Sequence, residues 1–402
     1  MPQNKDVNWL FSRAFLATVP ITILLIYVTI FERNGLLLAS GNVVGRDFVN
    51  YWMGGSSALA GLSQSLFVFD TYVVLLREAF GPAINDHNWS YPPHFLLLVT
   101  PFGTLPYLLS LFVWTVLGML VYLAACLKNA WRFDDFLILI LAPASISVVF
   151  AGQNGLFTGA LLVAGLRLMG PRPVLAGICF GLLTIKPQLG ILLPFALLAS
   201  RQWVVIASAC VTAAGAIAMS GLVFGFETWW LYLTETWPYQ TSIMKEAPNI
   251  APMMPTVFMA ARDLGLSSDL ALMAHMPFAL MAVAAVAWAF WQKQHRELQI
   301  IVLIVATFVA TPYGFYYDMP ALAFAALMFA RYLEKQGRPV NLYLVPMLAW
   351  LVPAFGRMIA LTLAPFGVLF VLAFFALAVR ELHLAGHPAQ GEVKPAPAPQ
   401  QA

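Results

Sequence analysis

Apolar runs that could cross a membrane recur along the whole of this sequence, and no other feature constrains the fold as strongly. Hydrophobic residues make up 61% of the 402 residues and charged residues only 10%, whereas a soluble domain carries about 25% charged residues. A spanning helix needs ~20 apolar residues. We therefore expect an all-α integral membrane protein with about 12 transmembrane helices, from runs near 14–31, 105–127, 134–150, 155–169, 173–186, 188–200, 203–225, 270–291, 298–312, 317–331, 341–355 and 358–380.

Several of these runs are too short to cross a bilayer at right angles. The runs that meet at Lys186 are separated by Pro187, and proline ends a helix and leaves backbone groups without partners. Such backbone is tolerated at membrane depth only where it is buried in protein or lines a cavity. We expect broken or bent helices around Lys186 and near Tyr313.

The distribution of basic residues predicts the orientation. With twelve spans both termini lie on one side, and placing that side in the cytoplasm puts fourteen of the 21 basic residues inside, as the positive-inside rule requires. The long connections 32–104 and 226–269 then lie outside. We expect one transmembrane domain over 1–383, with an uncleaved first helix, and a disordered cytoplasmic tail over 384–402 that is rich in Pro, Ala and Gln.

The first outer connection contains a predicted amphipathic helix that starts near Asp47. At helical spacing, Asp47, Asn50, Gly54, Ser57 and Gly61 form a small, polar stripe, so we expect the helix to lie in the outer interface with this stripe facing a cleft. Asp47 at the helix start has two explanations, since carboxylates favour helix N-termini and also serve as catalytic bases. For His94 the alternative to a functional role is a satisfied interface histidine.

Charged residues inside apolar segments are costly at membrane depth and are therefore functional candidates. Lys186, Asp318 and Arg357 are such residues, and the turn Gly152–Gly155 lies at the same predicted level. Snorkelling to the interface is the alternative for an isolated cation. Carboxylates and cations converging on one face instead suit transfer from a phosphorylated lipid. No phosphate-binding Gly-rich loop or HExxH zinc motif is present.

At these positions the sequence resembles glycosyltransferase family 87, which includes polyprenol-phosphate-mannose-dependent mannosyltransferases. The resemblance rests on Gly45-Arg46-Asp47-Phe48, Tyr91-Pro92-Pro93, Gly152-Gln153-Asn154, Lys186-Pro187-Gln188, and Pro312-Tyr313 with Tyr316 to Asp318, in that order. It implies a GT-C fold and an active site at the outer face of the bacterial inner membrane. The mycobacterial members often carry a His in the segment that matches 312–318, where this chain has Tyr313 and Tyr316.

The resemblance also implies residue roles. Asp47 matches the family's catalytic aspartate and would remove a proton from the acceptor hydroxyl during an inverting transfer. Lys186 and Arg357 would hold the lipid phosphate, with Arg46 and His94 as further candidates. The substrate-binding candidates are Asn50, Tyr91, Gln153, Asn154, Gln188, Tyr313, Tyr316 and Asp318. The expected partners are a polyprenyl-phosphate sugar, a lipid or glycan acceptor and the bilayer, without nucleic acid, cofactor or metal, and we expect a monomer.

Two other classes of function remain open at this stage. Broken helices with central charges also fit a secondary transporter or lipid flippase, and a polymerase or ligase of surface polysaccharide uses polyprenyl-linked donors too. Geometry separates them. A transferase should gather Asp47, Lys186 and Arg357 in one outward cavity, whereas a transporter should place its charges near the midplane between two repeats.

Overall fold

The computed structural model describes residues 33–127, 132–246, 253–292, 295–358 and 366–386. The predicted first helix near 14–31 and the end of the predicted tail lie outside these ranges. The described residues are almost entirely helical, with a single two-stranded hairpin in which Arg33 pairs with Leu38. The all-α class predicted from the apolar runs is confirmed for this part of the chain.

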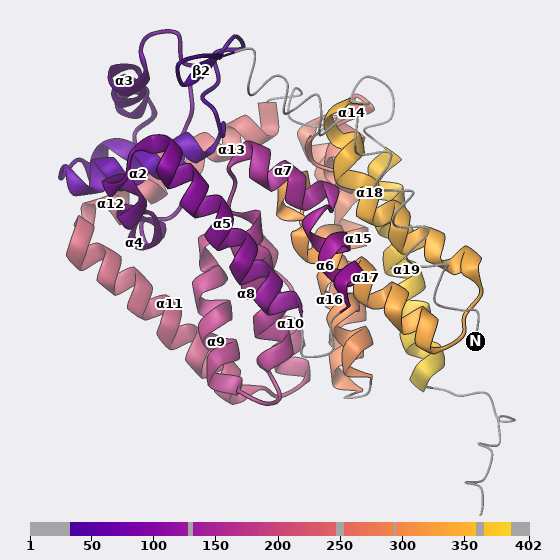
Figure 1. Cartoon of the computed structure of the whole chain (residues 1–402). Coiled ribbons are helices and arrows are strands. Elements are labelled where there is room, and N and C mark those ends of the chain that lie inside the picture. The colour runs from indigo at the N-terminus through magenta and orange to yellow at the C-terminus, as the bar shows by residue number, and fades with distance from the viewer. Residues whose placement is uncertain (1–32, 128–131, 247–252, 293–294, 359–365, 387–402) are drawn as a thin grey trace, which may run out of the picture.

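The first long connection folds into short elements at one end of the bundle, which we call the site end (Figure 1). The predicted amphipathic helix is found there as α2, and a second helix, α3, follows it. The elements are β1 (Arg33–Asn34), β2 (Leu37–Leu38), α2 (Phe48–Leu59), η1 (Ser63–Leu66), α3 (Phe69–Phe80), α4 (Phe95–Val99) and η2 (Thr100–Thr104).

We predicted that the polar stripe of α2 faces a cleft. This prediction is wrong for the part of the stripe at Gly54, which is packed against another segment. Gly54 packs on Trp89, and a Cβ on Gly54 would come within 2.4 Å of that ring. A Cβ on Gly55 would lie 2.5 Å from the Val99 carbonyl oxygen. The small residues therefore let α2 approach the next segment closely, and only the first turn of the stripe reaches the polar site described below.

The remaining chain forms a bundle whose helices run alternately toward and away from the site end (Figure 1). The helices are α5 (Tyr107–Cys126), α6 (Phe133–Ile140), α7 (Pro143–Ala151), α8 (Gly155–Leu168), α9 (Pro173–Leu182), η3 (Leu183–Ile185), η4 (Pro187–Gly190), α10 (Leu193–Ala199), α11 (Trp203–Phe224), α12 (Glu227–Leu231), the π-helical turn η5 (Tyr232–Thr236), α13 (Trp237–Glu246), α14 (Val257–Asp263), α15 (Ser268–Trp291), α16 (Arg296–Ala310), η7 (Tyr316–Asp318), α17 (Pro320–Lys335), η8 (Val340–Tyr343), α18 (Leu344–Met358) and α19 (Gly367–Gly386).

The predicted count of about twelve membrane spans is not confirmed by the described part of the chain, when only length and composition are considered. Four described helices, α5, α11, α15 and α19, are long and apolar enough to cross a membrane, and the pair α6 and α7, bent by 49°, would make a fifth. The other predicted runs that fall in the described ranges form helices, but these are shorter than the ~20 residues of a perpendicular span. The predicted breaks are found, because η3 and η4 flank Lys186 and η7 separates α16 from α17.

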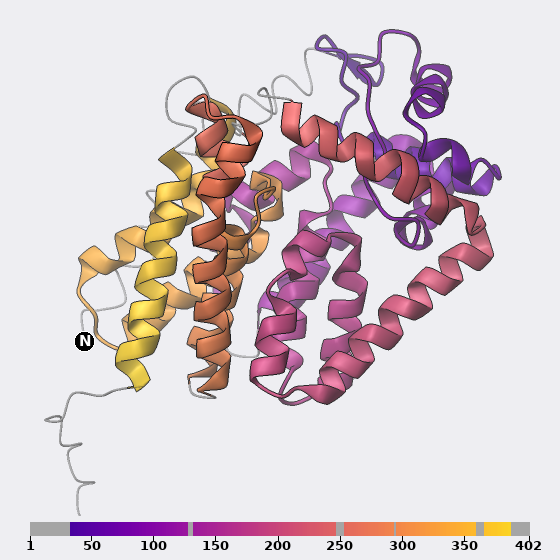
Figure 2. The ribbon, with the colours of Figure 1, turned by 180° about the vertical axis from the view of Figure 1, so that it is seen from behind.

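Small residues bring α9 and α11 into close contact. A Cβ on Gly177 would lie 2.4 Å from Cβ of Ser208, and one on Gly181 would lie 2.6 Å from Cβ of Thr212. Such small-residue pairs four apart are a common way to join helices in a membrane. From this contact α11 rises to the segment α12–α13, which lies across the site end (Figure 2).

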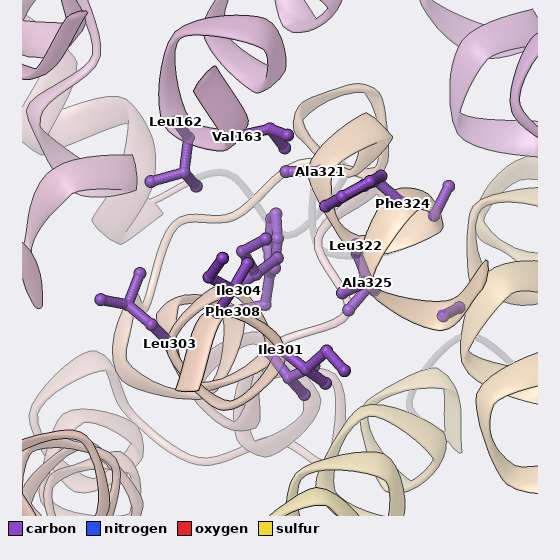
Figure 3. Packing of buried hydrophobic residues seen from close by; sticks show 14 of the residues in the cluster. Leu162, Val163, Ile301, Leu303, Ile304, Phe308, Ala321, Leu322, Phe324 and Ala325 are labelled. Carbon is purple, nitrogen blue, oxygen red and sulfur yellow. The ribbon is translucent and has the colours of Figure 1, made fainter. Parts of the chain in front are cut away.

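The core of the bundle is built around α16, whose residues from Leu298 to Ala310 are all buried. Figure 3 shows Ile304 and Phe308 of α16 facing α17 and α8. A helix that is apolar all round lies in a protein core or in a membrane, and α16 is enclosed by other helices. This enclosed core holds α8 and α17 in place, and the turns that begin both helices carry site residues. At the other end of the bundle, which we call the opposite end, α19 continues to Gly386, past the predicted boundary at 383.

Candidate functional site

Asp47 is positioned by a tight turn that packs against the turn before α8. The Asp47 N–H donates to the Ala151 carbonyl oxygen at 3.0 Å. Gly152 has a positive φ of 62°, and a Cβ there would lie 2.4 Å from the Gly45 carbonyl oxygen. Only glycine combines this conformation with such a close approach. The two sequence motifs at 45–48 and 152–154 are therefore in direct contact.

The Asp47 side chain is held by an amide and does not act as a helix cap. Asp47 occupies the N-cap position of α2, but its carboxylate accepts no capping hydrogen bond. Instead, Nε2 of Gln153 donates to Oδ2 of Asp47 at 2.9 Å. No described residue donates to the other carboxylate oxygen, Oδ1. Asp47 therefore keeps an oxygen that can accept a proton or a hydrogen bond from a ligand.

Two buried tyrosines fix the orientation of the Gln153 amide. The Tyr51 hydroxyl donates to Oε1 of Gln153 at 2.6 Å, and the Tyr91 hydroxyl donates to the same oxygen at 3.2 Å. The two hydroxyl oxygens are 2.7 Å apart. Because Oε1 accepts these bonds, the amide NH₂ must point toward Asp47. Gln153 and Tyr91, both predicted as substrate-binding, thus belong to the support of Asp47.

Lys186 and Asp318 form a buried ion pair. Nζ of Lys186 lies 2.5 Å from Oδ1 of Asp318, and the two residues are 5% and 1% exposed. Oδ2 of Asp318 accepts from the Phe315 N–H at 3.3 Å. Both oxygens of Asp318 are therefore occupied, unlike those of Asp47. The helix breaks at Lys186 and before α17 bring the two charges together from segments 132 residues apart.

Tyr91 joins the ion pair to the Asp47 group. The Lys186 ammonium nitrogen lies 6.0 Å from the centre of the Tyr91 ring and 5.2 Å from that of Tyr317, within the range of cation–π attraction. The turn before α8 also meets η7, since a Cβ on Gly155 would lie 1.8 Å from the Tyr317 carbonyl oxygen. All five sequence motifs thus contribute at least one residue to one site.

Arg46 lies beside Asp47 in a strained conformation, with a positive φ of 40°. Its buried Nε has no hydrogen-bond partner in the described part of the chain. Tyr316 of η7 lies within electrostatic range of both Arg46 and Asp47. An unpaired guanidinium N–H is a donor suited to an anionic oxygen, so Arg46 can bind part of a ligand.

His94 contacts the Lys186 segment from the loop before α4. Its Nε2 lies 3.2 Å from the Thr184 hydroxyl oxygen, and its ring stacks on Trp229 with centroids 5.7 Å apart. Burial lowers the pKa of His94 to about 4. The imidazole is therefore neutral at pH 7, and it would offer a phosphate a hydrogen bond but no charge.

The remaining predicted residues are dispersed. Asn50 Oδ1 accepts from the Tyr72 hydroxyl at 2.6 Å and so joins α2 to α3. Asn154 is fully buried at the start of α8, and neither atom of its amide has a partner among the described residues. Gln188 is half-buried in η4, and Tyr313 packs edge-to-face on Phe258 of α14 at 5.3 Å. Arg357 belongs to the last turn of α18, and its side chain lies outside what the structure describes.

Sequence reasoning missed Tyr51 and His87. Tyr51 follows Asp47 by four residues, and this spacing places both on one helix face, so the signal was present. His87 stands in an irregular loop without a pattern around it. Burial lowers its pKa most, while the Asp47 carboxylate raises and Arg46 lowers it, so His87 lies close to both charges. Its buried Nε2 has no partner in the ranges that the structure covers.

The fold and this site define a polytopic membrane protein with two carboxylates, two cations and several phenols gathered at one end of its bundle. The groups of three or more His, Cys, Asp or Glu side chains that a metal needs are not found among the described residues. The family model of glycosyltransferase family 87 matches residues 89–312. The chain therefore belongs to glycosyltransferase family 87 and is a membrane glycosyltransferase. The comparisons with curated proteins and with solved structures give no match.

Proposed function

We propose that this protein transfers mannose from a polyprenyl-phosphate donor to a lipid or glycan acceptor, with inversion at the anomeric carbon and Asp47 as the general base. The observation that carries the proposal is the state of the Asp47 carboxylate. One of its oxygens is fixed by Gln153 and the other accepts nothing from the described residues. Asp318, the other carboxylate of the site, has both oxygens occupied.

The proposed reaction exchanges one bond at the anomeric carbon. The acceptor hydroxyl oxygen forms a bond to this carbon, and the bond from the carbon to the phosphate oxygen breaks. The hydroxyl proton passes to Oδ1 of Asp47, and both bonding electrons leave with the polyprenyl phosphate. This leaving group is already stable as an anion, so it needs charge stabilisation and no general acid.

Cations of the site are the proposed partners of the phosphate. The Lys186 ammonium has three N–H donors, of which one is directed to Asp318, so the others can serve phosphate oxygens. The unpaired Nε of Arg46 is a second donor. We propose Arg357 as a third charged donor to the phosphate and His94 as an uncharged donor. Because Asp318 already balances Lys186, the ion pair holds the ammonium in place before the donor binds.

The proposed location is the bacterial inner membrane with the site end in the periplasm. The opposite end carries most of the described basic residues, among them Arg132, Arg167, Arg201, Arg296 and Arg331, in short connections or helix ends. Such an excess marks the cytoplasmic side. The aromatic segments 33–104 and 226–246 lie at the other end, and both termini would lie in the cytoplasm.

The test is the choice of donor by purified protein in lipid nanodiscs. Turnover should occur with polyprenyl-phosphate mannose and a membrane lipid extract as the acceptor source. It should not occur with GDP-mannose, because no phosphate-binding loop for a nucleotide is present. NMR of the product should show the anomeric configuration opposite to that of the donor. Turnover with GDP-mannose alone, or retention of configuration, would exclude the proposed mechanism.

A further inference from the structure

A hollow of about 130 Å³ lies at the site end, apart from Asp47 and between segments that are distant in the sequence. One side is formed by the start of α3, including Phe69 and Asp70. The facing side is formed by η5 and α13, including Glu235 and Tyr239. Trp89, from the loop that leads to α4, lines the hollow between them. Three separate segments thus meet around one small space.

Aromatic rings form part of the apolar wall, together with Leu66 and Val68. The Phe69 and Tyr239 rings stack with centroids 4.6 Å apart and an angle of 27°, and Trp89 packs edge-to-face with Phe67 at 6.3 Å. Ligand sites commonly pair aromatic walls with a few polar groups that fix orientation. The hollow is smaller than the ~300–1,000 Å³ of a drug-sized site, so it suits a single ring of a larger molecule.

The polar lining of the hollow includes two carboxylates beside Asn88, Thr236 and Tyr239. Asp70 and Glu235 are exposed carboxylates, and neither has a salt-bridge partner in the described part of the chain. Ionised carboxylates only accept hydrogen bonds, so a ligand here must donate them. Asp70 is also explained by its place in the first turn of α3. Glu235 lies in the π-helical turn η5, which joins α12 directly to α13 and is no separate helix N-terminus, and π-turns are frequent at functional sites.

The hollow is connected to the catalytic group through α2. The Trp89 ring packs on Gly54, and Nε1 of Trp89 donates to the Tyr91 carbonyl oxygen at 2.7 Å. Asp47 and Gly54 are seven residues apart, and at a rise of 1.5 Å per residue this is roughly 10 Å along the helix axis. A ring in the hollow would therefore lie at least one sugar unit away from the hydroxyl that reacts at Asp47.

We propose that this hollow binds an uncharged sugar ring of the acceptor, one or more units away from the sugar that is modified. The proposal rests on the proposed function and adds that the acceptor carries a glycan of at least two units. A neutral sugar has an apolar C–H face for the aromatic wall and hydroxyl donors for Asp70 and Glu235. A phosphate or uronic acid would meet two carboxylates of the same sign, which is unfavourable.

The test measures binding without turnover, so that it is independent of Asp47. Saturation-transfer NMR would be recorded on the full-length protein in nanodiscs with a panel of neutral di- and trisaccharides in the manno, gluco and galacto series. At least one should bind wild type and Asp47→Asn equally. The double variant Asp70→Asn, Glu235→Gln should bind it at least tenfold more weakly. Glu78→Gln, which changes an exposed carboxylate on α3 outside the hollow, should bind as wild type does.

Three results would overturn the proposal, and none of them depends on the transfer reaction. They are no binding by any member of the panel, equal binding by wild type and the double variant, and binding of cationic amino-sugar oligomers in place of the neutral ones. Loss of turnover in Asp47→Asn with unchanged binding would support both proposals. Normal turnover in Asp47→Asn with the predicted binding pattern would reject the catalytic role alone.

Discussion

The two ends of the bundle differ in how they hold their carboxylates. At the opposite end, Oδ1 of Asp135 accepts from two nitrogens of Arg331, at 2.9 and 2.6 Å, and Oδ2 accepts from the Arg132 N–H at 3.2 Å. Glu381, which is fully buried, lies between Arg338 and Arg380 at 2.8 and 2.9 Å. At the site end, Asp47 is held by one neutral amide. Carboxylates with all oxygens paired join helices, whereas one with an open oxygen can react.

The Lys186–Asp318 ion pair shares features with the fully paired carboxylates of the opposite end and with the Asp47 group. It resembles the ion pairs of the opposite end, since it joins distant segments and both oxygens of Asp318 are occupied. It lies beside Tyr91, however, which also supports Asp47. The comparison therefore assigns a structural role to the Asp318 carboxylate and leaves the remaining N–H groups of Lys186 for a ligand. The following substitutions test these assignments, from the largest expected effect to the smallest.

Asp47→Asn should have the largest effect on the reaction. Asn keeps the size of the side chain and a hydrogen bond with Gln153, but it cannot take the acceptor proton, and loss of a general base typically costs ~10²–10⁴-fold in rate. The donor KM and the apparent Tm should stay near wild type. Steady-state kinetics and thermal unfolding in nanodiscs measure these quantities. Turnover within threefold of wild type would reduce Asp47 to a structural residue.

Lys186→Met should have the largest effect on stability. It leaves Asp318 buried without a counter-charge, and breaking a buried pair in this way costs about 3–5 kcal/mol. The double variant Lys186→Met, Asp318→Asn should recover most of the apparent Tm, because neither charge then remains. Its donor KM should stay raised if the ammonium binds phosphate. If the donor KM of the double variant equals that of wild type, the Lys186–Asp318 ion pair has only a structural role.

Asp135→Asn is the matched change at the opposite end. Arg331 would lose its main partner but keep Glu334, at 3.0 Å, so a loss of about 1–2 kcal/mol is expected for the hydrogen bonds involved. Turnover per folded molecule and the donor KM should not change. A tenfold loss of turnover at unchanged Tm would contradict the assignment of a purely structural role to the carboxylates of the opposite end.

His94 should produce the smallest effect, seen as a pH dependence of stability. Burial lowers the pKa of His94 to about 4, below the value near 6.5 of an unfolded histidine. Between these values the unfolded chain binds more protons, so stability falls as the pH drops from about 6.5 to 4 and is unaffected above this range. His94→Gln should flatten the change in Tm between pH 7.5 and 5. His295→Gln, an exposed histidine at the opposite end, should keep the wild-type change.

Much of the fold and part of the site could be predicted from the sequence, for identifiable reasons. Apolar runs define helices because backbone polar groups in a membrane must be satisfied internally. Pro187 indicated a helix break after Lys186, because proline ends a helix and leaves backbone groups without partners. Glycines at 152 and 155 showed where a turn lies but not what it contacts. Their contacts with 45–48 and Tyr317 depend on side-chain volume in three dimensions.

Other features could not be predicted because they depend on long-range pairing. The ion pair of Lys186 with Asp318 joins residues 132 positions apart, and no local pattern specifies it. The predicted number of spans is not confirmed, because helices such as α16 and α17 are core elements of the bundle and are shorter than the ~20 residues of a perpendicular span. The glycines of α2 looked like part of a cleft, whereas they serve close packing on Trp89.

The central claim is that the open oxygen of Asp47 receives the acceptor proton, and a ternary complex tests it most directly. We would determine the structure of Asp47→Asn with polyprenyl-phosphate mannose and an acceptor bound, since this variant should bind both without turnover. The account predicts the acceptor oxygen at about 2.6–3.2 Å from the side chain at position 47, on the side away from Gln153, with the phosphate near Lys186 and Arg46. An acceptor oxygen placed beside Asp318, with position 47 out of hydrogen-bond reach, would contradict it.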